Sequence, residues 1–180
     1  MNVRWLVGLA VLVVAAVLAQ KVLASSSTPS VGAPAPDFTL SSQEGTSVSL
    51  SAYRGQWVVL YFYPKDMTTG CTIEAHNFQR DQPEFAKRGA VVLGVSVDSV
   101  DSHKKFCTKE GLNFKLLADS DKKVTEEYGS LMPVIHIAQR NTFIIDPQGK
   151  IAKVYTSVDP NKHSTEVLAE LDELQKSAAK

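Results

Sequence analysis

The chain has 180 residues, of which 44% are hydrophobic and 21% are charged. This composition fits one globular domain and excludes a fibrous or disordered chain. The 19 basic residues balance the 19 acidic residues, so the sequence offers no electrostatic surface for nucleic acid, and we expect no nucleic-acid partner.

Residues 1–24 have the plan of a signal peptide. Arg4 precedes an apolar run over residues 5–19, and the small residue Ala24 ends the segment at a plausible cleavage site. An uncleaved membrane anchor is the alternative, because the apolar part is nearly long enough to span a bilayer. Lys21 shortens that part and favours cleavage. Either way we expect an exported domain in the bacterial periplasm, soluble after cleavage or tethered to the inner membrane.

Residues 25–36 form a segment rich in Ser, Pro and Ala. It has too few apolar side chains to pack, so we predict a linker. The folded domain then covers residues 37–180. Two short pieces between residues 38 and 50, FTL and VSL, predict a hairpin added at the N-terminal side of the fold.

The first half of the domain alternates apolar runs with helical patterns. Residues 57–63 and 90–97 predict strands that are buried on both faces. Residues 72–88 and 99–110 predict helices, and the second opens with Ser and Asp at capping positions. Pro83 lies inside the first helix, so we expect it to kink that helix or split it in two.

In the second half, a short apolar piece at 115–118 precedes a short helix at 122–129. Residues 140–146 and 150–156 predict a hairpin around the turn PQG. An amphipathic helix over 163–177 closes the chain. This order predicts an α/β fold with three layers, thioredoxin-like, in which a central mixed sheet holds a parallel strand pair joined by a right-handed crossover.

The stretch YPKDMTTGCTIEAH places Cys71 between a turn and a helix. A thiol in the first helical turn faces unpaired backbone N–H groups and the positive end of the dipole, which favours the thiolate. The helix end supplies only about 0.3–2 kcal/mol, so a reactive thiol needs a cation as well. Arg140 opens a strand expected beside the end of the first strand, where its guanidinium could reach the sulfur. A structural disulfide to Cys107 stays open at this point.

Residues 64–71 follow the pattern P-x-x-x-T-x-x-C, which ends at Cys71. This pattern resembles the signature of the peroxiredoxin family, whose members are thiol peroxidases that reduce hydroperoxides. The blocks TGCTIEAHNFQRD, SVDSVDSHKKFC, FKLLADSDKKVTEEYG and RNTFIIDPQGKI resemble its Q-type subfamily, the bacterioferritin comigratory proteins. The resemblance runs from about Gly32 to the C-terminus.

The resemblance implies a role for each matching residue. Cys71 would be the peroxidatic nucleophile, which attacks a peroxide oxygen and becomes sulfenic acid. Thr68 would hydrogen-bond the thiolate and the attacked oxygen, although a turn threonine also serves as a backbone cap. Pro64 would shield the sulfur from water. Arg140 would stabilise the thiolate and the charge along the breaking O–O bond. Glu74 would orient Arg140, or would only complement the helix dipole.

The sequence departs from the subfamily where many members carry a second cysteine, five residues after the first. That position is His76, which lies well round the helix from Cys71, and we predict a surface or packing residue. Cys107 is then the candidate for the resolving thiol, as in another branch of the subfamily. A disulfide needs Cα atoms no more than about 7 Å apart, so we expect a helix end to unwind locally.

Other classes remain as alternatives. Two histidines and both cysteines, His76, His103, Cys71 and Cys107, could ligate a soft metal, as in an exported copper chaperone of thioredoxin-like fold. Such chaperones usually have two closely spaced cysteines, which this chain lacks. A disulfide oxidoreductase would need C-x-x-C at the helix start, which is also missing. His136 and His163 are expected to be surface or packing residues.

The resemblance also implies partners. We expect a hydroperoxide as substrate, hydrogen peroxide or an organic hydroperoxide, and a thioredoxin-like or other dithiol protein as reductant. We expect no cofactor, no metal and a monomer.

Overall fold

The computed structural model describes residues 28–178 and is built around one seven-stranded sheet, with the strand order β2-β1-β5-β4-β3-β6-β7. The strands are β1 (Thr39–Ser42), β2 (Ser47–Ser49), β3 (Trp57–Phe62), β4 (Ala90–Ser96), β5 (Lys115–Ala118), β6 (Asn141–Ile145) and β7 (Ile151–Thr156). The helices are the 3-10 turn η1 (Leu50–Tyr53), α2 (Thr69–Lys87), α3 (Val100–Glu110), α4 (Lys123–Glu127) and α5 (His163–Ala178).

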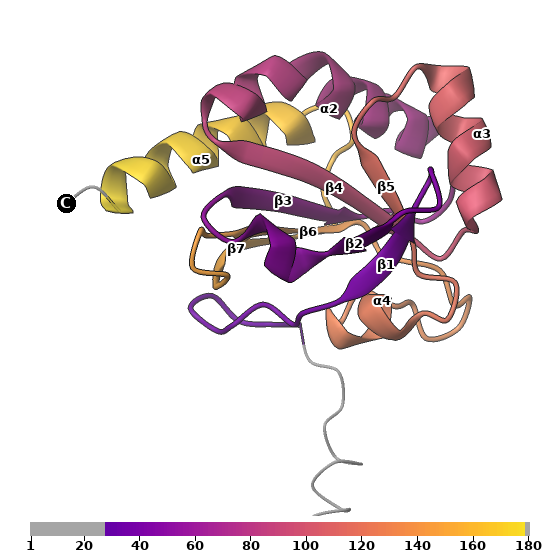
Figure 1. Cartoon of the computed structure of the whole chain (residues 1–180), viewed down its shortest axis with the longest axis horizontal. Helices are drawn as coiled ribbons and strands as arrows, with labels where there is room; N and C mark the ends of the chain where they lie inside the picture. Colours follow the sequence, from indigo (N-terminus) through magenta and orange to yellow (C-terminus); the bar gives the residue numbers. More distant parts are fainter. Residues whose placement is uncertain (1–27, 179–180) are drawn as a thin grey trace, which may run out of the picture.

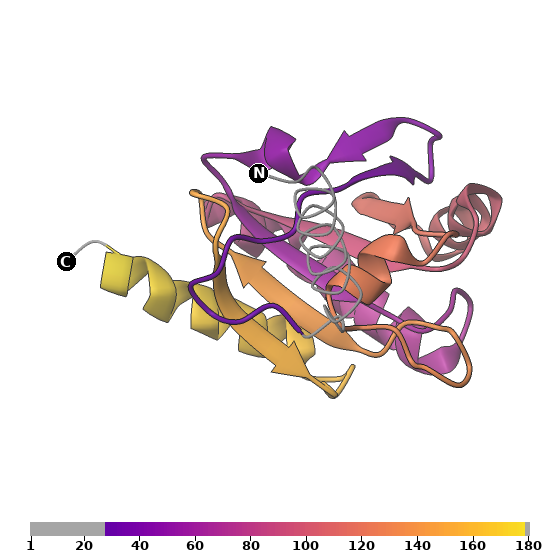
Figure 2. The same cartoon turned by 90° about the horizontal axis from the view of Figure 1, so that it is seen from below.

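The sheet is mixed, as predicted. β3 and β4 pair in parallel, and β4 pairs in parallel with β5. β6 runs antiparallel to β3, and β7 runs antiparallel to β6. The β1–β2 hairpin joins the sheet through β5, and Figure 2 shows this hairpin and β7 at opposite edges. The predicted α/β fold and its added hairpin are therefore confirmed.

Both faces of β3 are covered, which explains its unbroken apolar sequence. Val59 and Tyr61 face the layer that contains α2, α3 and α5, while Leu60 and Phe62 face the layer that contains α4. Figure 1 shows these two layers above and below the sheet. Because side chains alternate along a strand, each face of β3 contributes to a separate apolar cluster.

Pro83 does not split α2, which continues from Thr69 to Lys87. Of the two predicted effects of Pro83, the split into two helices is therefore wrong, and the kink stays a prediction. Phe78 and Phe85, on either side of Pro83, are both fully buried against the sheet, and this packing offsets the lost backbone hydrogen bond. The Gln82 side chain also donates to the carbonyl of Phe78 (3.3 Å).

The prediction of an unpacked linker is also wrong for residues 32–35. The N–H of Gly32 donates to the carbonyl of Ile151 (2.8 Å), and the N–H of Ala35 donates to the carbonyl of Gly149 (2.9 Å). Ala35 is buried against the face that carries α4. Backbone hydrogen bonds hold this segment against the domain. Because every residue can make such bonds, the lack of apolar side chains was a poor guide to the conformation of the segment.

The predicted signal peptide or membrane anchor, residues 1–24, lies outside the described residues. Within residues 28–178, we find no helix with the length and apolar character that a membrane crossing requires.

Candidate active site

Cys71 is the third residue of α2, just beyond the end of β3. The first backbone bond of α2 runs from the N–H of Thr72 to the carbonyl of Thr68 (2.9 Å). Thr68 is the N-cap residue, but its side chain caps no N–H group. The N–H groups of the first turn are therefore open to a ligand that approaches the buried sulfur.

Arg140 contacts the sulfur directly. Its Nη2 donates to Sγ of Cys71 (3.4 Å), and its Nη1 donates to Oε2 of Glu74. The carbonyl of Arg140 accepts from the N–H of Ser157 (3.1 Å), which fixes the start of β6. Burial opposes the charge, but Glu74 and Cys71 raise the pKa of Arg140, so the guanidinium is always protonated beside the thiol.

Glu74 lies one turn after Cys71 on the same side of α2 and is fully buried. Its Oε1 has no hydrogen-bond partner among the described residues. Burial raises the pKa of Glu74 to about 7, although the charge and hydrogen bond of Arg140 act in the opposite direction. The predicted Glu74–Arg140 contact is present.

Gly70 makes room for the guanidinium. A Cβ atom at this position would lie 3.3 Å from Nη2 of Arg140 and 3.8 Å from Cγ of Pro160. The first of these contacts is tight and the second is ordinary, so any larger residue would press on the guanidinium that contacts the sulfur. The sequence indicated a glycine before the cysteine, but it carried no signal that this glycine faces Arg140.

Two other predicted residues lie in the loop before α2. The hydroxyl of Thr68 donates to the carbonyl of Lys65 (3.0 Å), so it tightens the loop rather than pointing its proton at the sulfur. Pro64 follows Tyr63, whose N–H makes a last bond to the carbonyl of Val95 (3.1 Å), and the ring of Pro64 ends the strand. The predicted roles of Thr68 and Pro64 in peroxide chemistry stay predictions.

Cys107 lies in α3 and packs into the same apolar cluster as Cys71, on the face that carries α2, α3 and α5. Both thiols are free. Burial, together with the negative charges of Asp66 and Glu44, raises the pKa of Cys107 to about 12. A thiol in this environment is a poor nucleophile where it stands.

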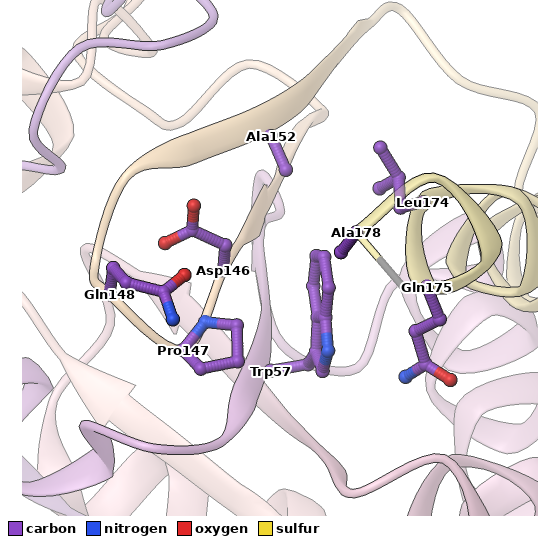
Figure 3. A pocket seen from close by; sticks show the side chains of 8 residues that line it. All are labelled: Trp57, Asp146, Pro147, Gln148, Ala152, Leu174, Gln175 and Ala178. Carbon is purple, nitrogen blue, oxygen red and sulfur yellow. The ribbon is translucent and has the colours of Figure 1, made fainter. Parts of the chain in front are cut away.

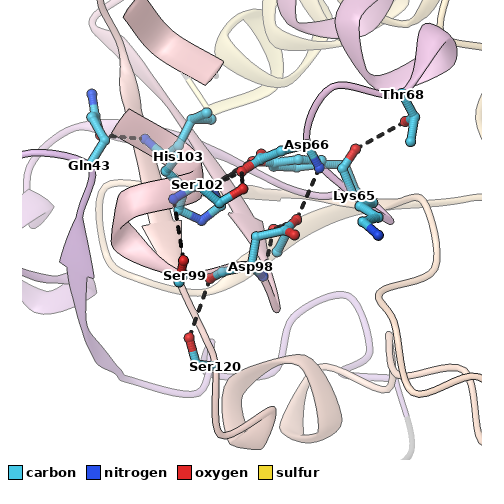
Figure 4. Close-up of polar contacts among 12 residues, drawn as sticks. Gln43, Lys65, Asp66, Thr68, Asp98, Ser99, Ser102, His103 and Ser120 are labelled. Atoms are coloured by element: carbon cyan, nitrogen blue, oxygen red, sulfur yellow. Dashed lines mark hydrogen bonds and ion pairs between the residues drawn. The ribbon is translucent and has the colours of Figure 1, made fainter. Parts of the chain in front are cut away.

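A polar cluster joins the loop before α2 to α3, and the sequence did not reveal it (Figure 4). Oδ2 of Asp66 lies 2.9 Å from Nδ1 of His103, and Oδ1 accepts from the hydroxyl of Tyr63 (2.7 Å). All three residues are buried. An aspartate in a turn and a histidine in a helix are ordinary in sequence, and only the fold brings them together.

The four residues proposed for a copper site are not assembled. His76 is half exposed and pairs with Glu110 (3.0 Å), while His103 is occupied by Asp66. Within residues 28–178, no three His, Cys, Asp or Glu side chains are grouped so that they could hold a metal ion. The copper-chaperone alternative therefore has no support.

A pocket at the opposite end of β3 contains no cysteine (Figure 3). Trp57, the first residue of β3, forms one wall, and Leu174 of α5 and Pro147 of the β6–β7 turn lie around it. Cys71 follows the other end of β3. The pocket thus does not belong to the site around the thiol.

Comparisons with known proteins agree with this arrangement. The model of the AhpC/TSA family matches residues 31–154. The chain is 39% identical over 153 residues to peroxiredoxin Bcp of Bacillus subtilis, which covers 82% of this chain and 98% of that protein. It is 41% identical over 142 residues to peroxiredoxin Bcp of Xanthomonas campestris, and this match covers 75% of this chain and 88% of that protein.

Solved structures are similar as well. A crystal structure of peroxidoxin BcpB from Mycobacterium tuberculosis matches with a TM-score of 0.77 at 33% identity, over 81% of this chain and 97% of that one. The bacterioferritin comigratory protein of Xanthomonas campestris, studied for its alkyl peroxide reduction activity, matches with a TM-score of 0.75 at 36% identity, over 84% and 100%.

Proposed function

Because this chain belongs to the AhpC/TSA family and is a peroxiredoxin of the Bcp and Q type, and thus a thiol peroxidase, we propose that Cys71 is its peroxidatic cysteine. The observation that carries this assignment is the contact between Nη2 of Arg140 and Sγ of Cys71 at 3.4 Å. A fixed cation and open N–H groups at a helix start stabilise negative charge on the sulfur and on the peroxide oxygen that leaves when the O–O bond breaks.

In the proposed first step, the Cys71 thiolate attacks one oxygen of the hydroperoxide. An S–O bond forms, the O–O bond breaks, and water or an alcohol leaves after taking up a proton. Arg140 lies where charge develops along that bond, and Glu74 holds Arg140 in place. The substrates would be hydrogen peroxide and organic hydroperoxides. The alkyl peroxide reduction activity of the related Xanthomonas campestris protein supports the second class.

In the proposed second step, Cys107 attacks the sulfenic sulfur, which gives an intramolecular disulfide and releases water. Its presence in the same apolar cluster as Cys71 supports this choice. With a pKa of about 12 in its buried position, Cys107 must leave that position before it can act as a thiolate. A thioredoxin-like dithiol donor would then reduce the disulfide, and the cycle would serve antioxidant defence.

We further propose that the protein is exported and works as a monomer. The signal-peptide plan of residues 1–24 supports export. Cell fractionation, with intact mass of the recovered protein, would distinguish a chain cut after Ala24 from a full-length tethered chain. Recovery of the chain from the cytoplasm would contradict export.

The central test uses peroxide turnover by wild type, Cys71→Ser and Cys107→Ser, first with dithiothreitol and then with thioredoxin. We expect no turnover for Cys71→Ser. Cys107→Ser should keep partial turnover with dithiothreitol and lose turnover with thioredoxin. Mass spectrometry of the peroxide-treated wild type should show a link between Cys71 and Cys107. Sulfenic or sulfinic acid on Cys71 as the dominant product, without this link, would refute Cys107 as the resolving thiol.

A further inference from the structure

The cluster around Asp66 and His103 connects the two segments that carry the cysteines (Figure 4). Asp66 lies in the loop that leads to α2, five residues before Cys71. His103 lies in α3, four residues and thus about one turn before Cys107. The buried side of α3 presents both His103 and Cys107. A contact at His103 therefore bears directly on where Cys107 is held.

The Asp66 side chain is saturated by partners from both segments. Its Oδ2 accepts from the hydroxyl of Ser102 (2.7 Å) and lies 2.9 Å from Nδ1 of His103, both in α3. Its Oδ1 accepts from the hydroxyl of Tyr63 (2.7 Å). The N–H of Asp66 donates to Oδ2 of Asp98 (3.0 Å), which anchors the loop from the side of β4.

Among the described residues, all polar partners of the His103 ring lie at Nδ1: the two carboxylate oxygens of Asp66 (3.1 and 2.9 Å) and the hydroxyl of Tyr63 (3.2 Å). The ring is fully buried, and its Nε2 has no partner among the described residues. A proton on Nδ1 therefore fits best, because it serves Asp66 and leaves no buried N–H without an acceptor. Loss of the Asp66 carboxylate would leave the ring only the Tyr63 hydroxyl, and loss of the ring would leave the carboxylate only two hydroxyl donors. In a buried site, such a loss is more costly than the loss of an exposed contact.

Few other polar contacts hold α3 on the domain. At its far end Glu110 pairs with His76 (3.0 Å), whose side chain is half exposed, and such surface pairs contribute little. Between the two ends, α3 is held by apolar packing of Phe106 and Cys107. The Asp66 cluster is thus the main directional tie between α3 and the loop that delivers Cys71.

We propose that the Asp66–His103 contact is a latch that holds α3 on the active-site loop and thereby limits how often Cys107 is released toward the Cys71 sulfenic acid. The second part rests on the function proposed above. His103 touches none of the reacting atoms and is a positioning residue. Resolution by Cys107 and a second oxidation by peroxide compete for the same sulfenic acid. A weaker latch therefore favours the disulfide over the sulfinic acid.

The test compares two substitutions in the full chain. His103→Leu removes the donor while filling much of the volume, and His103→Asn supplies an amide donor near the place of Nδ1. Hydrogen exchange of α3 amides in the reduced protein should quicken at least about tenfold in His103→Leu, which corresponds to about 1.4 kcal/mol, and much less in His103→Asn. In His103→Leu, the peroxide concentration that converts half of Cys71 to sulfinic acid should also rise. The matched control is Lys105→Ala, on the exposed side of α3.

Two further variants guard against a folding defect. Ser102→Ala removes one hydrogen bond to Asp66, keeps the His103 ring, and should shift exchange in the same direction by a smaller factor. In an Asp66→Asn background, His103→Leu should have less effect than in wild type, because the partner is already changed. Equal effects in both backgrounds would overturn the pairing.

The readouts separate the two proposals. If wild type forms no Cys71–Cys107 link but α3 exchange quickens in His103→Leu, the resolving role of Cys107 fails and the hold on α3 stands. Unchanged α3 exchange in folded His103→Leu, or equal quickening in every helix, overturns the latch even when the disulfide forms normally.

Discussion

Cys71 and Cys107 are the same residue type on the same side of the sheet, in opposite electrostatic surroundings. Both are buried in one apolar cluster, with exposed fractions of 2% and 8%. Cys71 stands at a helix start against a guanidinium. Cys107 stands within a helix, where burial and the charges of Asp66 and Glu44 raise its pKa.

The difference teaches that burial alone does not set the electrostatic surroundings of a thiol. Cys71 is the more enclosed of the two, yet it is the one that contacts a cation. The position along the helix and the sign of the nearest charge separate the two thiols. The same fold thus holds one thiol beside a fixed positive charge and the other where burial and negative charges favour the protonated form.

The largest expected effect is the difference between the oxidation rates of the two thiols. With hydrogen peroxide at pH 7, Cys71 in Cys107→Ser should be oxidised at least about a thousandfold faster than Cys107 in Cys71→Ser, because a pKa of about 12 leaves almost no thiolate. Intact-mass measurements over time give both rates. In denaturant the two rates should converge, and a large ratio that persists there would show that the fold is not its cause.

Removal of the cation should make Cys71 behave more like Cys107. Arg140→Met should lower the second-order rate with hydrogen peroxide by about 10²–10³, the size of effect seen when one preorganised donor is lost. Stopped-flow measurement of the first oxidation gives this rate. Arg80→Met is the matched control, since Arg80 is exposed and pairs with its neighbour Asp81. Equal rates for Arg140→Met and wild type would exclude the guanidinium as the decisive group.

The raised pKa of Glu74, which pairs with Arg140 beside Cys71, should make the stability of the protein depend on pH. Its folded pKa of about 7 lies above the ordinary 4.5, so the folded state binds this proton more tightly than the unfolded state. The resulting stabilisation is complete below about pH 4.5 and is lost as pH rises through about 7, by at most about 3 kcal/mol. The difference in unfolding free energy between wild type and Glu74→Gln should change with pH over this window. Denaturant titrations at several pH values measure it, and parallel profiles would contradict the raised pKa.

The smallest expected effect comes from Gly70. Gly70→Ala should crowd Nη2 of Arg140 and slow the oxidation of Cys71 by about tenfold. The same change should stabilise α2 by about 0.5–1 kcal/mol, because alanine favours a helix more than glycine does. Stopped-flow rates and thermal unfolding would show activity and stability moving in opposite directions. Thr69→Ala, next to it and exposed, should leave the rate unchanged.

Strong periodic patterns made much of the fold predictable. The unbroken apolar runs that form β3 and β4 fit only strands whose two faces are both buried. These two strands pair in parallel, as expected. The position of Arg140 beside Cys71 followed from the same sheet, because β6 lies next to β3. Local rules predicted less well where packing competes with them. Pro83 stays within one helix because buried phenylalanines flank it.

Contacts between distant residues were beyond the sequence. The contact between Asp66 and His103 joins residues 37 positions apart, and neither residue lies in a sequence pattern that predicts the contact. The hydroxyl of Thr68 donates to the carbonyl of Lys65 and not to the Cys71 sulfur. The spacing of these residues in the sequence does not decide between the two acceptors. The attachment of residues 32–35 uses backbone groups, which every residue possesses.

The enclosure of the Cys71 sulfur has a consequence for the whole cycle. With 2% of that residue exposed, the sulfur offers almost no surface that a folded donor protein could touch in this arrangement. In the proposed cycle, the donor would therefore meet a different shape of the chain from this one, and turnover would depend on how quickly the two shapes interconvert. If Cys71 and Cys107 act as proposed, a chain frozen in a rigid matrix in the present shape would form no disulfide, and further peroxide would carry Cys71 on to sulfinic acid.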